Sequence, residues 1–144
     1  MPAIDELERC VRVRGNAEEC VARVLARRGY EVRLVGREFK CEYGFDVLAY
    51  EPGSGMLLLI EVKEGPKARL SRTQRSILEL VNSRFANPRA FARIYARVAP
   101  RPLAELVWEY CEISEVVMFL VAQFDEYGNM IGDSDTVRFF EAMP

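Results

Sequence analysis

Histidine is absent from this chain of 144 residues. Its absence excludes histidine general bases, Ser–His and Cys–His nucleophile pairs, and zinc sites that use imidazole ligands. Any catalysis must therefore rely on carboxylates, on lysine, or on a metal ion held by oxygen atoms.

Long hydrophobic runs and paired cysteine motifs are also missing. No stretch approaches the roughly 18 apolar residues that a membrane-spanning helix needs. The opening residues, MPAIDELERC, contain early acids and no apolar segment of the kind found in signal peptides. The cysteines are widely spaced with no CxxC pair, at Cys10, Cys20, Cys41 and Cys111. We therefore expect a cytoplasmic protein with free thiols, the alternative being an intracellular disulfide.

Charge is unevenly distributed along the chain, although the formal net charge is only −2. Residues 63–101 carry ten basic and two acidic side chains, whereas residues 102–144 carry one basic and nine acidic side chains. A basic block of this kind can bind polyanions such as DNA. Alternatively, the two blocks neutralise each other within the fold or a dimer, or the acidic third binds a protein partner.

The hydrophobic pattern predicts a single α/β domain with a mixed central sheet. Residues 1–14 are expected to be an irregular or short helical leader, and residues 36–44 a loop. Helices are predicted from Asn16 to about residue 28, from 70 to about 84, and as a pair within 85–115. Strands are predicted at 30–35, 45–51, 56–63 and 116–124, with 136–142 returning as a C-terminal hairpin.

Three polar residues interrupt the otherwise apolar hairpin of residues 44–65: Asp46, Glu61 and Lys63. If the turn PGSG pairs Glu51 with Met56, then Asp46 lies opposite Glu61, and Lys63 follows on the same face. Opposed carboxylates destabilise a sheet unless a cation such as Mg²⁺ lies between them. The alternative is that Asp46 ends a loop and that Glu61 and Lys63 form an exposed ion pair.

This triplet resembles the motif of the PD-(D/E)xK nuclease superfamily, with Phe45 in the position of the proline. A second stretch, RGNAEECVARVLARRGYEV at 14–32, is similar to the opening of archaeal Holliday junction resolvases, with Glu19 as the helix carboxylate and Glu18 beside it. The resemblance covers about residues 12–84.

The resemblance implies a restriction-endonuclease-like core at about 12–84 plus strand 116–124, with a helical insertion at about 85–115. It implies an endodeoxyribonuclease in which Mg²⁺, or Mn²⁺ in its place, is held by Glu19, Asp46 and Glu61, while Lys63 manages the attacking water. It also implies a homodimer acting on branched DNA, above all a four-way junction. A restriction or repair nuclease and a non-catalytic DNA-binding or assembly module are the alternatives.

Further candidate residues follow the hairpin. Gln74 is expected either near the metal water or phosphate, as in that superfamily, or in an S-x-x-Q capping box with Ser71, and both roles can hold together. Arginines recur every fourth residue from Arg89 to Arg101 and can form a helical ridge that contacts DNA or is simply solvated. The residues expected to hold DNA phosphates nearest the site are Arg14, Lys67, Arg69, Arg72 and Arg75.

Overall fold

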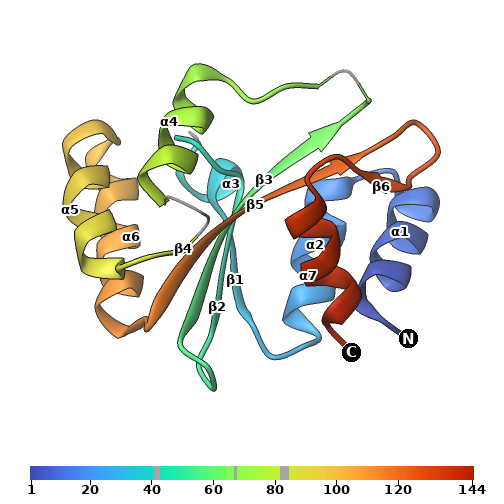
Figure 1. The fold of residues 1–144 in the computed structure, drawn as a ribbon, viewed down its shortest axis with the longest axis horizontal. Coiled ribbons are helices and arrows are strands. Elements are labelled where there is room, and N and C mark those ends of the chain that lie inside the picture. Colours follow the sequence, from blue (N-terminus) through green and yellow to red (C-terminus); the bar gives the residue numbers. More distant parts are fainter. Residues whose placement is uncertain (41–42, 67, 82–84) are drawn as a thin grey trace.

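The structure is a computed structural model that describes residues 1–40, 43–66, 68–81 and 85–144. A mixed β-sheet forms its centre (Figure 1). The strands follow the spatial order β1-β2-β3-β5-β4, and β6 pairs with the C-terminal end of β5. The central neighbours β3 and β5 are parallel, and the other paired strands are antiparallel. The strands are β1 Glu31–Leu34, β2 Val47–Glu51, β3 Met56–Glu64, β4 Phe85–Ala86, β5 Val116–Phe124 and β6 Met130–Ile131.

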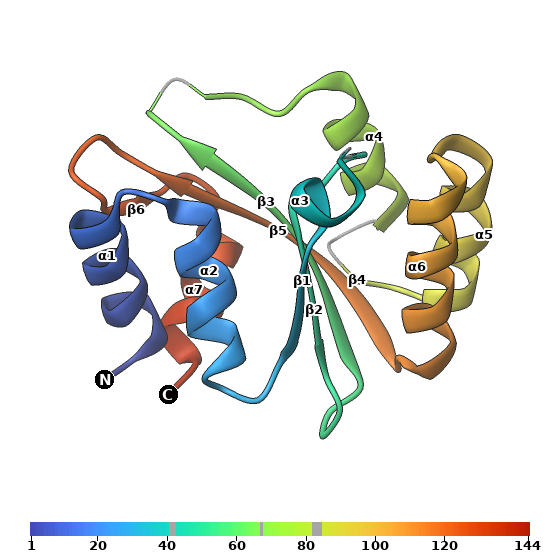
Figure 2. The same ribbon diagram turned by 180° about the vertical axis from the view of Figure 1, so that it is seen from behind.

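Helices cover both faces of this sheet (Figures 1 and 2). One face carries α1 Ala3–Arg14, α2 Ala17–Ala26 and α7 Ser134–Ala142. The other carries α3 Val35–Phe39, α4 Arg72–Val81, α5 Pro88–Val98 and α6 Arg101–Ile113. The fold class is α/β, as predicted, and the expected helical pair is α5 and α6. Among the described helices, none is long and apolar enough to cross a membrane.

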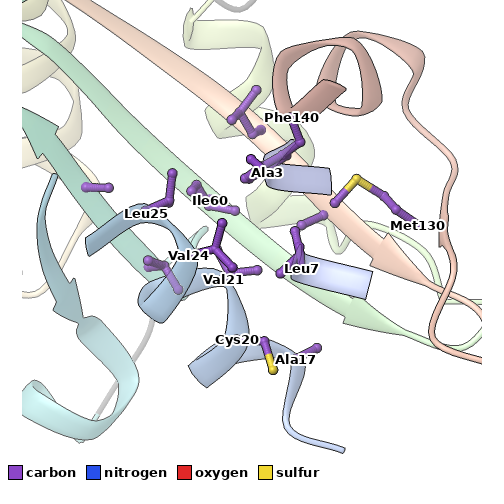
Figure 3. Packing of buried hydrophobic residues seen from close by; sticks show 14 of the residues in the cluster. Ala3, Leu7, Ala17, Cys20, Val21, Val24, Leu25, Ile60, Met130 and Phe140 are labelled. Carbon is purple, nitrogen blue, oxygen red and sulfur yellow. The ribbon is translucent and has the colours of Figure 1, made fainter. Parts of the chain in front are cut away.

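Two hydrophobic cores lie on opposite faces of strand β3. Its apolar run alternates between them, so that Leu57 and Leu59 pack beneath α5 and α6 while Leu58 and Ile60 pack beneath α1 and α2. Figure 3 shows the second of these cores, in which Leu7 of α1 and the valines of α2 surround Ile60. The continuous apolar sequence thus marks a central strand covered on both sides, as predicted.

The predicted Asn16 cap of α2 is confirmed, and α5 begins with an Asn cap that was not predicted. The Oδ1 of Asn16 accepts a hydrogen bond of 3.1 Å from the N–H of Glu19, which caps α2. At the start of α5, the Oδ1 of Asn87 accepts one of 3.1 Å from the N–H of Ala90, and Pro88 occupies the first turn. The direction and phase of α2, on which the candidate site depends, are therefore encoded locally.

The predicted C-terminal hairpin is wrong for residues 136–142, which form helix α7; only Met130–Ile131 return along β5. The hydroxyl of Thr136 explains the difference, because it accepts a hydrogen bond of 3.0 Å from the N–H of Val121 and donates one of 2.6 Å to Asp133. Phe140, one turn further on, is fully buried in the core. Tertiary packing overrides the strand preference of these β-branched and aromatic residues.

The helical alternative for the N-terminal leader is confirmed, and the segment predicted as a loop also contains helix. The N-terminal leader is the regular helix α1, whose buried residues Ala3, Leu7 and Val11 recur every fourth position. The loop predicted at 36–44 begins inside the short helix α3, where Val35 is buried; residues 41 and 42 of that loop lie outside the described residues. In both segments a few apolar side chains anchor the helix on the sheet.

The prediction of free thiols is wrong for Cys10 and Cys20, which form a disulfide between α1 and α2 with their Cα atoms 5.7 Å apart. Gly15, with φ of 72°, ends α1 and allows the chain to turn back so that the two helices pack side by side. Cys111 is free and buried, while Cys41 lies outside the described residues. The spacing of ten residues matches no short cysteine motif, so the sequence alone did not indicate this pairing.

We expect reduction of this disulfide to lower the free energy of unfolding by about 2–3 kcal/mol, because it closes a short loop in the unfolded chain. The melting temperature should then fall by roughly 5–10 °C. Calorimetry of the wild type with and without a reducing agent measures the shift, and a Cys10→Ala variant, which has no bridge to break, should not respond. A wild-type melting temperature that is the same in both buffers would contradict the assignment.

Candidate functional site

A polar cavity of about 420 Å³ opens where strand β3 ends, between the N-terminal ends of α2 and α4. The segment before β2, the end of β3 and the first turns of α2 and α4 all contribute side chains to it. Its lining residues are Asn16, Glu18, Asp46, Glu61, Val62, Lys63, Glu64 and Gln74. The structure thus brings together Asp46, Glu61, Lys63 and Gln74, as the sequence predicted.

The position of Asp46 follows from the hairpin register. Glu51 pairs with Met56 and Val47 with Ile60, which is the register predicted from the turn. Asp46 directly precedes β2; its N–H donates to the Ile60 carbonyl at 2.9 Å, and its Oδ2 accepts from the Val62 N–H at 2.7 Å. The Asp46 carboxylate therefore accepts a main-chain hydrogen bond from the end of β3 and lies beside that strand. The residue is only 5% exposed.

Glu61 and Lys63 lie on one face of β3, as their spacing of two predicts. The Lys63 ammonium is 3.4 Å from Oε1 of Glu61, while the intervening Val62 packs against the core on the α1 and α2 side. The Glu61 side chain is 4% exposed and that of Lys63 is 21% exposed. The pair is therefore not the solvated surface ion pair of the alternative interpretation. Burial gives its charges a substantial desolvation cost.

The helix carboxylate in the cavity is Glu18 rather than Glu19. Burial, together with the charge of Asp46, raises the pKa of Glu18, which indicates that these two carboxylates repel each other across the cavity. Glu19 instead pairs with Arg37 of α3 at 2.7 Å, and its side chain is 45% exposed. Since adjacent residues point in directions about 100° apart on a helix, the phase set by the Asn16 cap decides between them.

Two cavity residues were not predicted as site residues. Glu64 ends β3, and its Oε1 lies 3.4 Å from the N–H of Ala17 at the start of α2. Asn16 was identified only as a helix cap. The available signal was the run Glu61-Val62-Lys63-Glu64, which places a further acid directly after the motif at the strand end.

Gln74 forms the predicted capping box and also lines the cavity. Its Oε1 accepts a hydrogen bond of 2.8 Å from the N–H of Ser71, and its own N–H donates to Ser71 Oγ at 3.1 Å, which completes the capping box of α4. The side chain is 9% exposed and also lines the cavity. The cap fixes the amide beside the carboxylates.

The basic residues predicted to contact phosphate lie around this part of the molecule. Arg72 and Arg75 belong to α4, whose first turn supplies Gln74 to the cavity, and Arg69 precedes that helix. Arg14 ends α1, just before the Asn16 cap. All four side chains are exposed to solvent, whereas Lys67 lies outside the described residues.

Oxygen donors dominate the cavity, where the carboxyl groups of Glu18, Asp46, Glu61 and Glu64 face one ammonium group. Within the described ranges, no three Asp, Glu, Cys or His side chains are already arranged to hold a metal ion. Mg²⁺ needs fewer protein ligands than that, since it commonly binds one or two carboxylates and keeps several waters. The donor chemistry, the excess of negative charge and the room for water fit this cation.

The chain was compared with protein-family models, with curated proteins and with solved structures, and none of them matches it. No relative therefore supplies a function. The arguments that remain are the contacts of the chain's own residues and the motifs in its sequence. The class of protein that they define is an α/β domain with an acidic, lysine-containing cavity at the end of its central strand.

Proposed function

We propose that the chain is a Mg²⁺-dependent endonuclease that hydrolyses phosphodiester bonds in DNA and has a restriction-endonuclease-like fold. The observation that carries the proposal is the juxtaposition of Asp46, Glu61 and Lys63 in one open cavity at the end of β3. The mixed sheet with helices on both faces agrees with the architecture that the sequence resemblance implies.

The burial of the acids supports a functional rather than a structural role. Asp46 and Glu61 are 5% and 3% exposed, respectively, and Glu18 contributes a third carboxylate to the same cavity. Gathering like charges in a partly dehydrated place destabilises the fold unless another group compensates. A single ammonium group, that of Lys63, does not balance these acids, whereas an added divalent cation would.

Asp46 and Glu61, with Glu18 in the place that the resemblance assigned to Glu19, would hold the metal ion. When bound, Mg²⁺ supplies a Lewis acid that polarises the phosphodiester and favours ionisation of a water molecule. Its two principal ligands are fixed beforehand, because Asp46 is held by the Val62 N–H and Glu61 by the rigid central strand.

Lys63 would act on the attacking water and on the phosphate. Its ammonium lies beside Glu61 and is partly exposed to the cavity, so it can orient or deprotonate a water molecule there and stabilise negative charge that develops on the phosphoryl oxygens. The Gln74 amide is positioned to donate a hydrogen bond to the same water or to a phosphate oxygen. The exposed Arg69, Arg72 and Arg75 would hold the DNA backbone nearby.

The substrate that the resemblance favours is branched DNA, with a four-way junction as the first choice. The resemblance also implies a homodimer, since two symmetric nicks resolve such a junction, and products that carry a 5′-phosphate. The alternative is a non-catalytic DNA-binding or assembly module, for which the acidic C-terminal third would supply a surface for a protein partner.

Incubation of the protein with end-labelled four-way junction, flap, duplex and single-stranded DNA, and with a matched RNA duplex, tests the proposal. We expect cleavage in Mg²⁺ or Mn²⁺, none in EDTA, and the highest rate on branched DNA. If all substrates are bound but none is cut in either metal, the non-catalytic alternative is correct.

A further inference from the structure

A second cavity, of about 370 Å³, lies along the seam between α5 and α6. Its lining residues are Arg89, Ala92, Arg93, Trp108, Cys111 and Glu112, and none of them belongs to the acidic cavity. Its volume falls within the ~300–1,000 Å³ typical of small-molecule sites. It therefore has room for a ligand of about nucleotide size.

Trp108 provides a fixed aromatic surface on one side of this cavity. The side chain is 39% exposed, although a large aromatic residue of this kind is usually buried. Its Nε1 donates a hydrogen bond of 2.7 Å to Oε1 of Glu112, one turn further along α6. This bond orients the indole ring and leaves part of it open to the cavity.

Two arginines provide the positive charge of the cavity. Arg89 and Arg93 lie one turn apart on α5, where both are exposed, and neither forms an ion pair with any part of the chain that the structure describes. The predicted arginine ridge ends on this helix at Arg97, because Arg101 begins α6 and pairs with Glu105. The two cavity arginines thus remain available for an anion.

The floor of the cavity is apolar and uncharged. Ala92 and Cys111 are 3% and 2% exposed, respectively. Burial raises the pKa of the Cys111 thiol to about 12, so the thiol carries no charge at neutral pH. The acid that lines the cavity, Glu112, already accepts the indole N–H. With two guanidinium groups and one carboxylate, the cavity favours a ligand that combines a flat apolar part with negative charge.

We propose that this cavity binds an unpaired nucleotide of a DNA strand, with the base stacked on Trp108 and the adjoining phosphates held by Arg89 and Arg93. Stacking of bases on an aromatic residue, combined with basic contacts to the backbone, is the general means of binding single strands. A base inside a duplex is already stacked on its neighbours, so it cannot use the indole surface in this way. The inference rests on the proposed function for the identity of the ligand as DNA.

The second cavity and the acidic cavity lie on different parts of the α4, α5 and α6 layer. Helix α5 lies beside α4 in both views (Figures 1 and 2), and α4 carries Gln74 of the acidic cavity together with the exposed Arg72 and Arg75. The side of α5 that meets α4 carries Ile94 and Val98, whereas Arg89 and Arg93 lie on the side of α5 that lines the seam with α6. The nucleotide cavity is therefore separate from the acidic cavity, and a DNA strand bound there would add contacts away from the scissile bond.

The test uses the fluorescence of Trp108, which is the one tryptophan of the chain. The full-length protein is titrated in EDTA, where no cleavage occurs, with oligothymidylate and with a blunt duplex of equal length. We expect the single strand to quench the fluorescence and the duplex to leave it nearly unchanged. The double variant R89Q/R93Q should bind the single strand at least tenfold more weakly, and the slope of log affinity against log salt should fall by about 1.4.

Arg97→Gln is the control, because it removes one positive charge from the same helix but outside the cavity, and it is compared with each of Arg89→Gln and Arg93→Gln as well as with the double variant. It should keep nearly wild-type affinity. Trp108→Leu should weaken binding of a labelled oligothymidylate by about tenfold, measured by anisotropy, and circular dichroism checks that each variant is folded. An absence of quenching at saturating single strand, or an equal loss in Arg97→Gln, would overturn the inference.

These outcomes separate the inference from the nuclease proposal. Quenching by the single strand without cleavage of any DNA would leave the nucleotide cavity in place and remove the proposed activity. Cleavage in Mg²⁺ with no quenching in EDTA would support the nuclease proposal and rule out the nucleotide cavity.

Discussion

Replacement of Lys63 by Met is expected to lower the rate of phosphodiester hydrolysis by a factor of about 10²–10⁴, the usual range for a general acid–base or charge-stabilising group. The reason is positional, since the ammonium lies 3.4 Å from Glu61 in the cavity that would hold the metal ion and the scissile phosphate. Methionine preserves the length and much of the packing of the side chain. Metal binding should survive because the carboxylates remain.

Single-turnover cleavage of a labelled four-way junction measures this effect, and a thermal melt confirms that the variant is folded. Arg75→Gln is the matched control, because it also removes one positive charge near the site but from an exposed position on α4. It should weaken DNA binding severalfold without a comparable loss in the rate of the bound complex. Hydrolysis by the Lys63 variant at the wild-type rate would remove Lys63 from the mechanism and indicate a contaminating nuclease.

Replacement of Asp46 by Asn is expected to weaken Mg²⁺ binding by about 100-fold or more, since a neutral amide replaces a carboxylate ligand of a hard cation. The fold should be retained, because the amide oxygen can still accept the hydrogen bond that Val62 donates to Asp46. Asp46→Ala removes this acceptor as well and should lower the free energy of unfolding by about 1–3 kcal/mol. The two substitutions therefore separate the electrostatic role of Asp46 from its structural role.

Isothermal titration with Mg²⁺ and with Mn²⁺ measures these affinities. Glu18→Gln and Glu19→Gln form a matched pair that removes the same charge from neighbouring positions on α2. Only Glu18 lines the cavity, whereas Glu19 pairs with Arg37, so the first substitution should weaken metal binding and the second should not. If Asp46→Asn binds metal as tightly as the wild type, the metal site lies elsewhere.

The parts of the fold that depend on short-range rules could be predicted from the sequence. The PGSG turn fixed the register that places Asp46 beside the end of β3. The continuous run of apolar residues marked β3 as buried on both faces. The Asn16 cap and the Ser71–Gln74 capping box marked where α2 and α4 begin. These features depend on neighbours within a few residues, so a single sequence contains them.

The features that could not be predicted depend on contacts between distant segments. Helix α7 is selected over a strand by the contact of Thr136 with Val121. The disulfide depends on how α1 packs against α2. The ion pair of Glu19 with Arg37 of α3 also joins two segments that the sequence separates. Each of these features depends on a contact with residues that come close only when the chain folds.

Helices α5 and α6 lie in the one segment that connects β4 to β5. This segment leaves and rejoins the sheet at neighbouring positions, because Ala86 of β4 pairs with Val117 of β5. The anchoring strands are therefore already held together without the helices between them. A replacement of this segment by one of another shape leaves β3 and the acids at its end in place only if the new segment still covers Leu57 and Leu59. Under the proposed function, replacement of this one contiguous segment would change the surface offered to DNA, while the acids proposed to carry the cleavage chemistry stay on β3 and the segment before β2.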